Sequence, residues 1–162
     1  MDSKLDSWFL KVLDKTLEHE GGYVNDPTDP GGETQFGISK RAYPKEDIKA
    51  LTRERAAEIY YRDYWKAPRF DRLKNDELAA KLFDLGVNCG TGNAVRFLQG
   101  ALTLLGLRTP ADGAMGPQTA GYANSWRHQD ALLMAVKYLA ADRYVRLGKP
   151  RFLAGWLARL GE

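Results

Sequence analysis

The 162-residue chain contains one cysteine, two histidines and no long apolar run. A single cysteine excludes an internal disulfide framework and a cysteine-based metal cluster. Two histidines are too few for a multi-histidine metal site, so we expect no metal and no cofactor. No stretch approaches the roughly 18 apolar residues of a membrane-spanning helix. We therefore expect no stable membrane insertion.

The N-terminal sequence also lacks the pattern of a secretory leader. It reads MDSKLDSWFLKVL, with acidic and polar residues where a signal peptide carries its apolar segment. We therefore expect the protein to stay in the cytoplasm of its host until a pore or another export route releases it to the periplasm and cell wall.

Basic residues are concentrated towards the C-terminus. Residues 1–98 carry 16 Lys+Arg and 17 Asp+Glu, whereas residues 99–162 carry 8 and 4. This asymmetry favours an acidic polymer as partner, although a solvated basic face would give the same counts.

Most of the chain has the apolar periodicity of amphipathic helices. A helix is expected over residues 5–20 and another from the cap Thr52 to about Trp65, and further helices are expected to start at the caps Asn75 and Thr91, at Pro117, near residue 129 and at Pro150. The helix from about residue 129 to 147 should present one apolar face, made of Leu133, Val136, Ala140, Tyr144 and Leu147. Two short helical turns are expected near residues 39–43 and 45–51. A hairpin that pairs residues 23–24 with residues 34–38 would be the only sheet. The sequence thus predicts a mostly α fold with one small β-hairpin.

The stretch from Glu20 to Ile38, EGGYVNDPTDPGGETQFGI, carries the residues best suited to chemistry. Glu20 continues the apolar stripe of the first helix, after Thr16 and Leu17, at its C-terminal end. Desolvation and the negative end of the helix dipole both favour its uncharged acid form. Glycoside hydrolysis needs such a protonated carboxylic acid near neutral pH. Alternatively, Glu20 turns to solvent or bonds to the hairpin.

Two further side chains in this stretch suit the same reaction. Asp29 lies in a loop that can bring it opposite Glu20, to hold a water or to stabilise positive charge on the sugar ring. Asp26 stands in the same Asp-Pro context and competes for the role, and either aspartate could instead form an Asx-turn. The Thr34 hydroxyl could orient the water, or Thr34 could be an ordinary strand residue.

The motif HEGGYVNDPTDPGGETQFGIS resembles the signature of glycoside hydrolase family 108, the bacterial and phage N-acetylmuramidases. The resemblance covers about residues 10–95. It implies a lysozyme-like α+β fold with the hairpin next to the active-site cleft, and Glu20 as the general acid that cleaves the β-1,4 bond between N-acetylmuramic acid and N-acetylglucosamine. The order of Glu20, Asp29 and Thr34 is also similar to that of phage-type lysozymes, where the threonine follows the aspartate by six residues rather than five.

Six residues are candidates for substrate binding. Residues 82–99 also resemble the family, and Asp84 and Asn88 lie one helical turn apart there; a hydrogen-bonded pair on the helix face is the alternative. Aromatic side chains with polar tips suit sugar faces, although core packing would claim most of them. The candidate substrate-binding residues are Tyr23, Asp26, Tyr64, Trp65, Asp84 and Asn88.

The segment from Leu98 to Thr119 resembles the peptidoglycan-binding region that accompanies this family, through Asp112-Gly113 and Gly116-Pro117. A β-turn followed by a helix start would use the same residues. We expect a muramidase region over residues 1–95 and a helical peptidoglycan-binding-like region over residues 96–162, packed as one globule. The expected partner is the peptidoglycan glycan strand, with no nucleic acid, and the protein is expected to be a monomer.

Two other classes of function use the same features differently. A lytic transglycosylase would need Glu20 as its only catalytic carboxylate, and a non-catalytic wall-binding module would not need it at all. Cys89 lies on an expected core stripe and is interpreted as an inert buried thiol.

Overall fold

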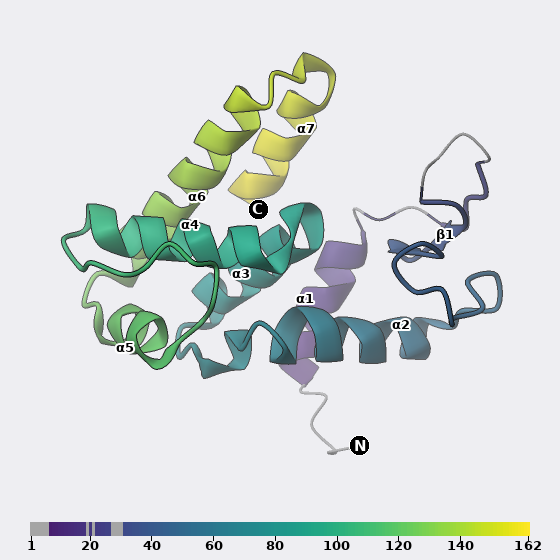
Figure 1. Cartoon of the computed structure of the whole chain (residues 1–162), viewed down its shortest axis with the longest axis horizontal. Helices are drawn as coiled ribbons and strands as arrows, with labels where there is room; N and C mark the ends of the chain where they lie inside the picture. Colours follow the sequence, from purple (N-terminus) through teal and green to yellow (C-terminus); the bar gives the residue numbers. More distant parts are fainter. Residues whose placement is uncertain (1–6, 19, 21, 27–30) are drawn as a thin grey trace. The chain divides into compact units, whose positions relative to one another are not determined.

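The computed structural model describes residues 7–18, 20, 22–26 and 31–162, and the chain divides into two compact units, residues 1–67 and 68–162. Helices make up most of the described residues (Figure 1). The described residues contain a single two-stranded antiparallel sheet. The predicted mostly α fold with one small hairpin is confirmed.

The first unit is built from two helical stretches and the hairpin. Its elements are α1 (Ser7–Leu17), β1 (Thr34–Gln35), β2 (Ile38–Ser39), α2 (Arg53–Tyr60) and the π-helical segment η1 (Tyr61–Lys66). Its large side chains at 1% exposure or less come from both helical stretches, the hairpin and the loop that follows it: Phe9, Leu13, Ile38, Ile48, Ile59 and Tyr60.

Helix α1 ends at Leu17, so Glu20 lies beyond the helix rather than in its last turn as predicted. The Glu20 N–H donates to the Leu17 carbonyl at 3.0 Å, an i to i−3 bond that closes a tight turn. Such tightening is common where a helix ends, and the Gly21-Gly22 pair that follows gives little support to further helix. Gly21 itself lies outside the described residues.

The hairpin is formed within residues 34–39. Thr34 pairs with Ser39 and Gln35 with Ile38, and Phe36 and Gly37 at the turn both have positive φ, 51° and 73°. A two-residue turn with this backbone matches the right-handed twist of the strands. Val24 joins Thr34 as an isolated bridge through two backbone hydrogen bonds of 2.8 Å. The predicted pairing with residues 23–24 is therefore reduced to this one bridge.

The segment after the hairpin differs from prediction in two ways. Residues 40–51 form turns and bends rather than short helices, because Pro44 disfavours helical backbone at the residue before it. The helix capped by the Thr52 side chain is present, but after Tyr60 it continues as the wider π-helical segment to Lys66.

The second unit is entirely helical among its described elements. They are η2 (Phe70–Arg72), α3 (Asp76–Cys89), α4 (Thr91–Leu104), α5 (Pro117–Ser125), α6 (Gln129–Arg146) and α7 (Pro150–Gly161). Helix α4 packs against both α3 and α6, and α6 and α7 form an antiparallel pair (Figure 1). The expected boundary between residues 95 and 96 falls inside α4, while the compact units divide after Ala67. The functional domain boundary stays a prediction.

The helix starts of this unit follow their local signals. The Asn75 side chain accepts the Leu78 N–H at 2.8 Å and caps α3, and Pro117 occupies the first turn of α5, as predicted. Gly90, with φ 92°, ends α3 and takes the N-cap position of α4 that was expected for Thr91. No helix among the described residues is both long and apolar enough to cross a membrane.

Candidate active site

Glu20 lies directly against the turn of the hairpin. It is half-buried, and its carboxylate approaches Gly37 so closely that a Cβ at Gly37 would lie 2.8 Å from Glu20 Oε2 and 3.1 Å from its carboxyl carbon. Real Cβ atoms do not approach other atoms this closely. The absence of a side chain at Gly37 therefore makes room for the carboxylate, and its positive φ requires glycine for a second reason.

Tyr60 completes the surroundings of the same turn. Its ring is 1% exposed, and its hydroxyl donates to the Phe36 carbonyl at 2.8 Å. A Cβ at Gly37 would lie only 2.6 Å from this hydroxyl oxygen. The end of α2, the hairpin turn and Glu20 thus converge on Gly37. The sequence interpretation missed Tyr60 and Gly37 as parts of the site, although a glycine at the second position of a two-residue turn is a recognisable signal.

Thr34 stands on the first strand of this hairpin. Its backbone bridges Val24 on one side and Ser39 on the other, and its half-buried hydroxyl donates to the Gly32 carbonyl over a long 3.4 Å. The strand pairing fixes the Thr34 backbone, while the weak hydrogen bond leaves its hydroxyl able to reorient.

The two candidate aspartates are placed differently. Asp26 is exposed, in the loop that follows Val24. Asp29 lies outside the described residues, so its role as the second carboxylate stays a prediction. Tyr23, close by, is 41% exposed and donates its hydroxyl to Glu33 Oε1 at 3.0 Å.

The aromatic candidates at the end of the second helical stretch have separate environments. Trp65 is 7% exposed, and its ring lies 5.3 Å from that of Trp8 and 5.7 Å from that of Phe9. Tyr64 is half-buried, with its ring 5.2 Å from that of Tyr60. Most of Trp65 therefore belongs to the core of the first unit, while Tyr64 keeps surface beside the residues that surround Gly37.

Asp84 and Asn88 bond to other helices of the second unit rather than to each other. Asp84 Oδ1 accepts from Arg159 Nε at 3.0 Å and lies 2.9 Å from Arg159 Nη2, and Lys81 Nζ lies 3.9 Å from Asp84 Oδ2. The Asp84 and Arg159 side chains are only 14% and 12% exposed. Asn88 donates to the Tyr144 hydroxyl at 2.7 Å. These two side chains join α3 to α7 and to α6.

The Asp112-Gly113 motif is held by a buried glutamine. Gln99, 1% exposed, donates to Asp112 Oδ1 at 2.8 Å and to the Ala114 carbonyl at 3.1 Å, and accepts the Gly113 N–H at 3.0 Å. Asp112 Oδ1 also accepts the Ala114 N–H at 2.9 Å, which makes an Asx-type turn. The hydrogen bond from Gln99, followed by that from Ala114, lowers the pKa of the Asp112 carboxyl.

Cys89 has the environment of a structural thiol. It is half-buried and its Sγ donates to the Leu85 carbonyl at 3.0 Å. Burial raises the pKa of the thiol to about 11, so the nucleophilic thiolate is scarce at neutral pH. The described residues contain no group of three or more His, Cys, Asp or Glu side chains placed to hold a metal ion.

Comparison with known proteins divides the chain into two matched segments. Residues 13–90 match a family model described as Glycosyl hydrolase 108, and residues 93–161 match one described as Predicted Peptidoglycan domain. Eleven chains of solved structures match. One is SagA of Brucella abortus, with 28% sequence identity, a TM-score of 0.74, and coverage of 94% of this chain and 89% of that one. A comparison with curated proteins gave no match.

Proposed function

Because residues 13–90 belong to the glycosyl hydrolase 108 family and a peptidoglycan domain follows them, the protein is a glycoside hydrolase with a muramidase-type action on peptidoglycan, and we propose that it is an N-acetylmuramidase. The bond cleaved is the β-1,4 linkage between N-acetylmuramic acid and N-acetylglucosamine. Glu20 acts as the general acid. The fold similarity over most of the chain agrees with the lysozyme-like α+β class predicted from the sequence.

The observation that carries the proposal is the contact between the Glu20 carboxylate and the hairpin turn at Gly37. A general acid must hold its proton close to the leaving oxygen in a fixed direction. Glu20 lies just after α1, half-buried, and its carboxylate lies against Gly37, where a side chain would collide with it. The hydrogen bond from the Tyr60 hydroxyl to the Phe36 carbonyl holds the turn in place. The carboxylate is thus held next to a turn that is itself fixed by a hydrogen bond.

Asp29 is the proposed second carboxylate, and Thr34 the proposed partner that orients the water. In that arrangement the enzyme inverts the anomeric configuration, and the two carboxyl groups stand about 6.5–9.5 Å apart to admit a water. The weakly bonded Thr34 hydroxyl, on the same hairpin as Gly37, supports a water-directing role. Asp26 is the competing aspartate. Separate Asp29→Ala and Asp26→Ala variants, assayed for turnover, decide between them.

The six proposed substrate-binding residues differ in how much surface they offer. Tyr23, Asp26 and Tyr64 are exposed or half-buried in the first unit and are the stronger proposals. Trp65 is mostly packed, so its contribution to binding rests on its remaining surface. Asp84 and Asn88 are engaged with Arg159 and Tyr144, and a sugar would have to compete with those partners.

Mass spectrometry of digested peptidoglycan tests the proposed reaction. Reducing N-acetylmuramic acid ends are expected from a muramidase. Anhydro-muramic ends would instead identify a lytic transglycosylase, and the absence of soluble products at saturating enzyme would identify a wall-binding module without catalysis. Either of these results overturns the proposal.

A further inference from the structure

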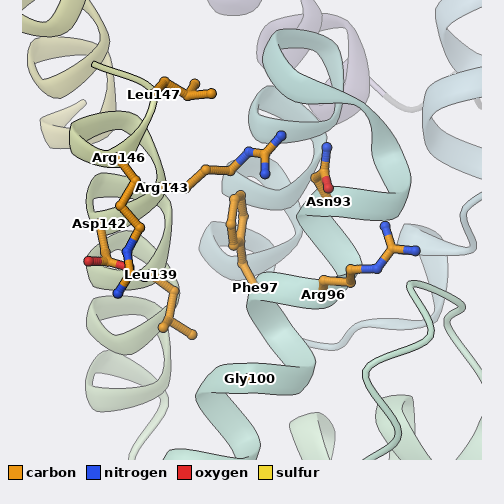
Figure 2. Close-up of a pocket in the computed structure, with 9 residues that line it drawn as sticks. All are labelled: Asn93, Arg96, Phe97, Gly100, Leu139, Asp142, Arg143, Arg146 and Leu147. Atoms are coloured by element: carbon orange, nitrogen blue, oxygen red, sulfur yellow. The ribbon is translucent and has the colours of Figure 1, made fainter. Parts of the chain in front are cut away.

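A groove between α4 and α6 is a second place on the molecule suited to a ligand. It encloses about 470 Å³ and lies wholly within the second unit (Figure 2). Its lining combines basic, amide and apolar side chains: Asn93, Arg96, Phe97, Gly100, Leu139, Asp142, Arg143, Arg146 and Leu147.

The charge of the groove is positive and its three guanidinium groups are unequally engaged. Arg146 pairs with Asp142 at 2.8 Å, and Arg96 donates over 3.5 Å to the Asp112 carbonyl. The Arg143 side chain forms no hydrogen bond or ion pair with any residue that the structure describes. Figure 2 shows Arg143 reaching from α6 over Phe97 towards Asn93. One guanidinium, with its fork of donors, thus faces the groove without an ion-pair partner among the described residues, since Asp142 pairs with Arg146.

The floor of the groove is apolar and closely built. Phe97 is 8% exposed, and Leu139 faces it from α6. At Gly100 a Cβ would lie 2.9 Å from Leu139 Cδ1, so the two helices approach as closely as a glycine permits. Asn93 donates to the Cys89 carbonyl at 2.7 Å, which leaves its amide oxygen able to accept an N–H from a ligand. The groove therefore offers a cation, a hydrogen-bond acceptor and a small apolar surface together.

We propose that this groove binds the carboxylate-bearing stem peptide of peptidoglycan, with Arg143 holding a carboxylate; the inference rests on peptidoglycan as the substrate of the proposed function. In an intact wall the lactyl group of muramic acid is amide-linked, so the glycan strand is neutral and the negative charges lie on the peptides. A guanidinium recognises a carboxylate through paired, charge-assisted hydrogen bonds. Alanine methyl groups of the peptide fit the Phe97 and Leu139 floor, and a peptide N–H fits Asn93.

The test is a titration of the ¹⁵N-labelled full-length protein with a synthetic stem tetrapeptide, followed by NMR. We expect shifts at Asn93, Phe97 and Arg143, and at least about tenfold weaker binding for Arg143→Glu, the effect of losing charge-assisted hydrogen bonds. Arg127→Glu is the matched control, because Arg127 is exposed, lies outside the groove and gives the same net charge. Its affinity should stay within about twofold of wild type.

Three further ligands distinguish the sources of binding. The same peptide with amidated carboxylates should bind at least about tenfold more weakly. A neutral chitooligosaccharide and inorganic phosphate should not shift the groove residues at the concentration where the peptide does. Equal weakening by Arg143→Glu and Arg127→Glu, full binding of the amidated peptide, or equal binding of phosphate or glycan in the groove would each overturn the proposal.

The outcome is separable from that of the catalytic proposal. A stem peptide contains no glycosidic bond, so its binding does not depend on Glu20 or on turnover. If the peptide does not bind the groove but muramidase products still form, only the groove proposal is wrong. If the peptide binds the groove but no muramidase products form, only the proposed reaction is wrong.

Discussion

At the scale of the residue, the proposed role of Glu20 as general acid depends on the close contacts that its carboxylate makes. The hairpin turn presents Gly37 to the carboxylate, and Tyr60 fixes that turn through the Phe36 carbonyl. A side chain at position 37 would occupy the space that both groups use. The proposed proton-donating role of Glu20 and the need for glycine at position 37 therefore both depend on one contact.

Replacing Glu20 with glutamine removes the transferable proton while keeping size and hydrogen-bonding capacity. We expect Glu20→Gln to lower the rate of muropeptide release by at least about 10²-fold, the usual contribution of a general acid. Glu18→Gln is the control, since Glu18 is exposed two residues earlier in the chain and the variant should retain near wild-type activity. The thermal midpoint of both variants should match wild type. If Glu20→Gln retains more than about a tenth of the activity, Glu20 is not the general acid.

Gly37→Ala tests the close approach itself, with Gly32→Ala as its matched control. Both glycines have positive φ, 73° and 70°, so either alanine costs about 1–2 kcal/mol of backbone strain. At Gly32 the nearest atom to a new Cβ is 3.9 Å away, whereas at Gly37 it is 2.6 Å. We expect Gly37→Ala to be the less stable of the two in urea unfolding and to lose most of its activity. Equal stability and equal activity would contradict the contact.

At the scale of the element, buried polar side chains decide how the helices of the second unit are joined. Asp84 on α3 is held by Arg159 on α7, and Gln99 on α4 binds the loop that contains Asp112. Packing also decided which face of α6 is buried. The sequence predicted Leu133 and Leu147 on the core stripe, but the structure buries Leu132, at 0% exposure, and leaves Leu147 44% exposed. Residues 132, 136, 140 and 144 form the buried stripe, four apart.

Removing Asp84 breaks its buried ion pair with Arg159. We expect Asp84→Ala to lower the free energy of unfolding by about 3–5 kcal/mol, the usual effect of breaking a buried ion pair. The double variant Asp84→Ala/Arg159→Leu should recover part of that loss in a double-mutant cycle. If Asp84→Ala is as stable as wild type but binds substrate poorly, Asp84 is a substrate ligand rather than a joint between helices.

The Asp112 loop gives a prediction for acid stability. Its hydrogen bonds depress the pKa of Asp112 in the folded protein, so the unfolded chain takes up a proton first as pH falls. The stabilisation is present above the unfolded value of about 3.9 and is lost as pH falls through the lower folded value. Asp112→Asn should therefore show a shallower fall in stability with pH in this acid range. Identical slopes in chemical unfolding at several pH values would refute the role of this carboxylate.

At the scale of the whole molecule, the two compact units differ in charge. Residues 1–67 carry 11 Lys+Arg and 13 Asp+Glu, while residues 68–162 carry 13 and 8. The basic excess is thus in the unit that contains the peptidoglycan-domain match and the groove, where attraction to a carboxylate-rich wall is useful.

Salt should weaken the attachment of the full-length protein to purified wall. Raising ionic strength from about 0.05 to 0.5 M shortens the screening length to a few ångströms, so we expect several-fold less protein to sediment with the wall. Walls whose carboxylates have been amidated should bind less and show little dependence on salt. Salt-independent sedimentation with untreated walls would mean that charge contributes nothing to the attachment.

The sequence determined the parts of this protein that depend on near neighbours along the chain. The mostly α fold, the caps at Thr52 and Asn75, the proline start of α5 and the family motif around Glu20 were all readable, because helix period and capping act over about four residues. The end of α1 and the phase of α6 were misplaced, since each depends on competition between nearly equal local choices.

Only the tertiary structure decided which distant side chains meet. Gly37 and Tyr60 lie against Glu20 and its turn because the hairpin packs on the end of α2, and Asp84 meets Arg159 across 75 positions because α3 and α7 belong to one unit. The groove is lined by α4 and α6, which approach closely at Gly100, and Arg143 has no ion-pair partner there among the described residues. Such contacts follow from the packing of whole helix faces, and a local pattern gives the face but not the partner that covers it.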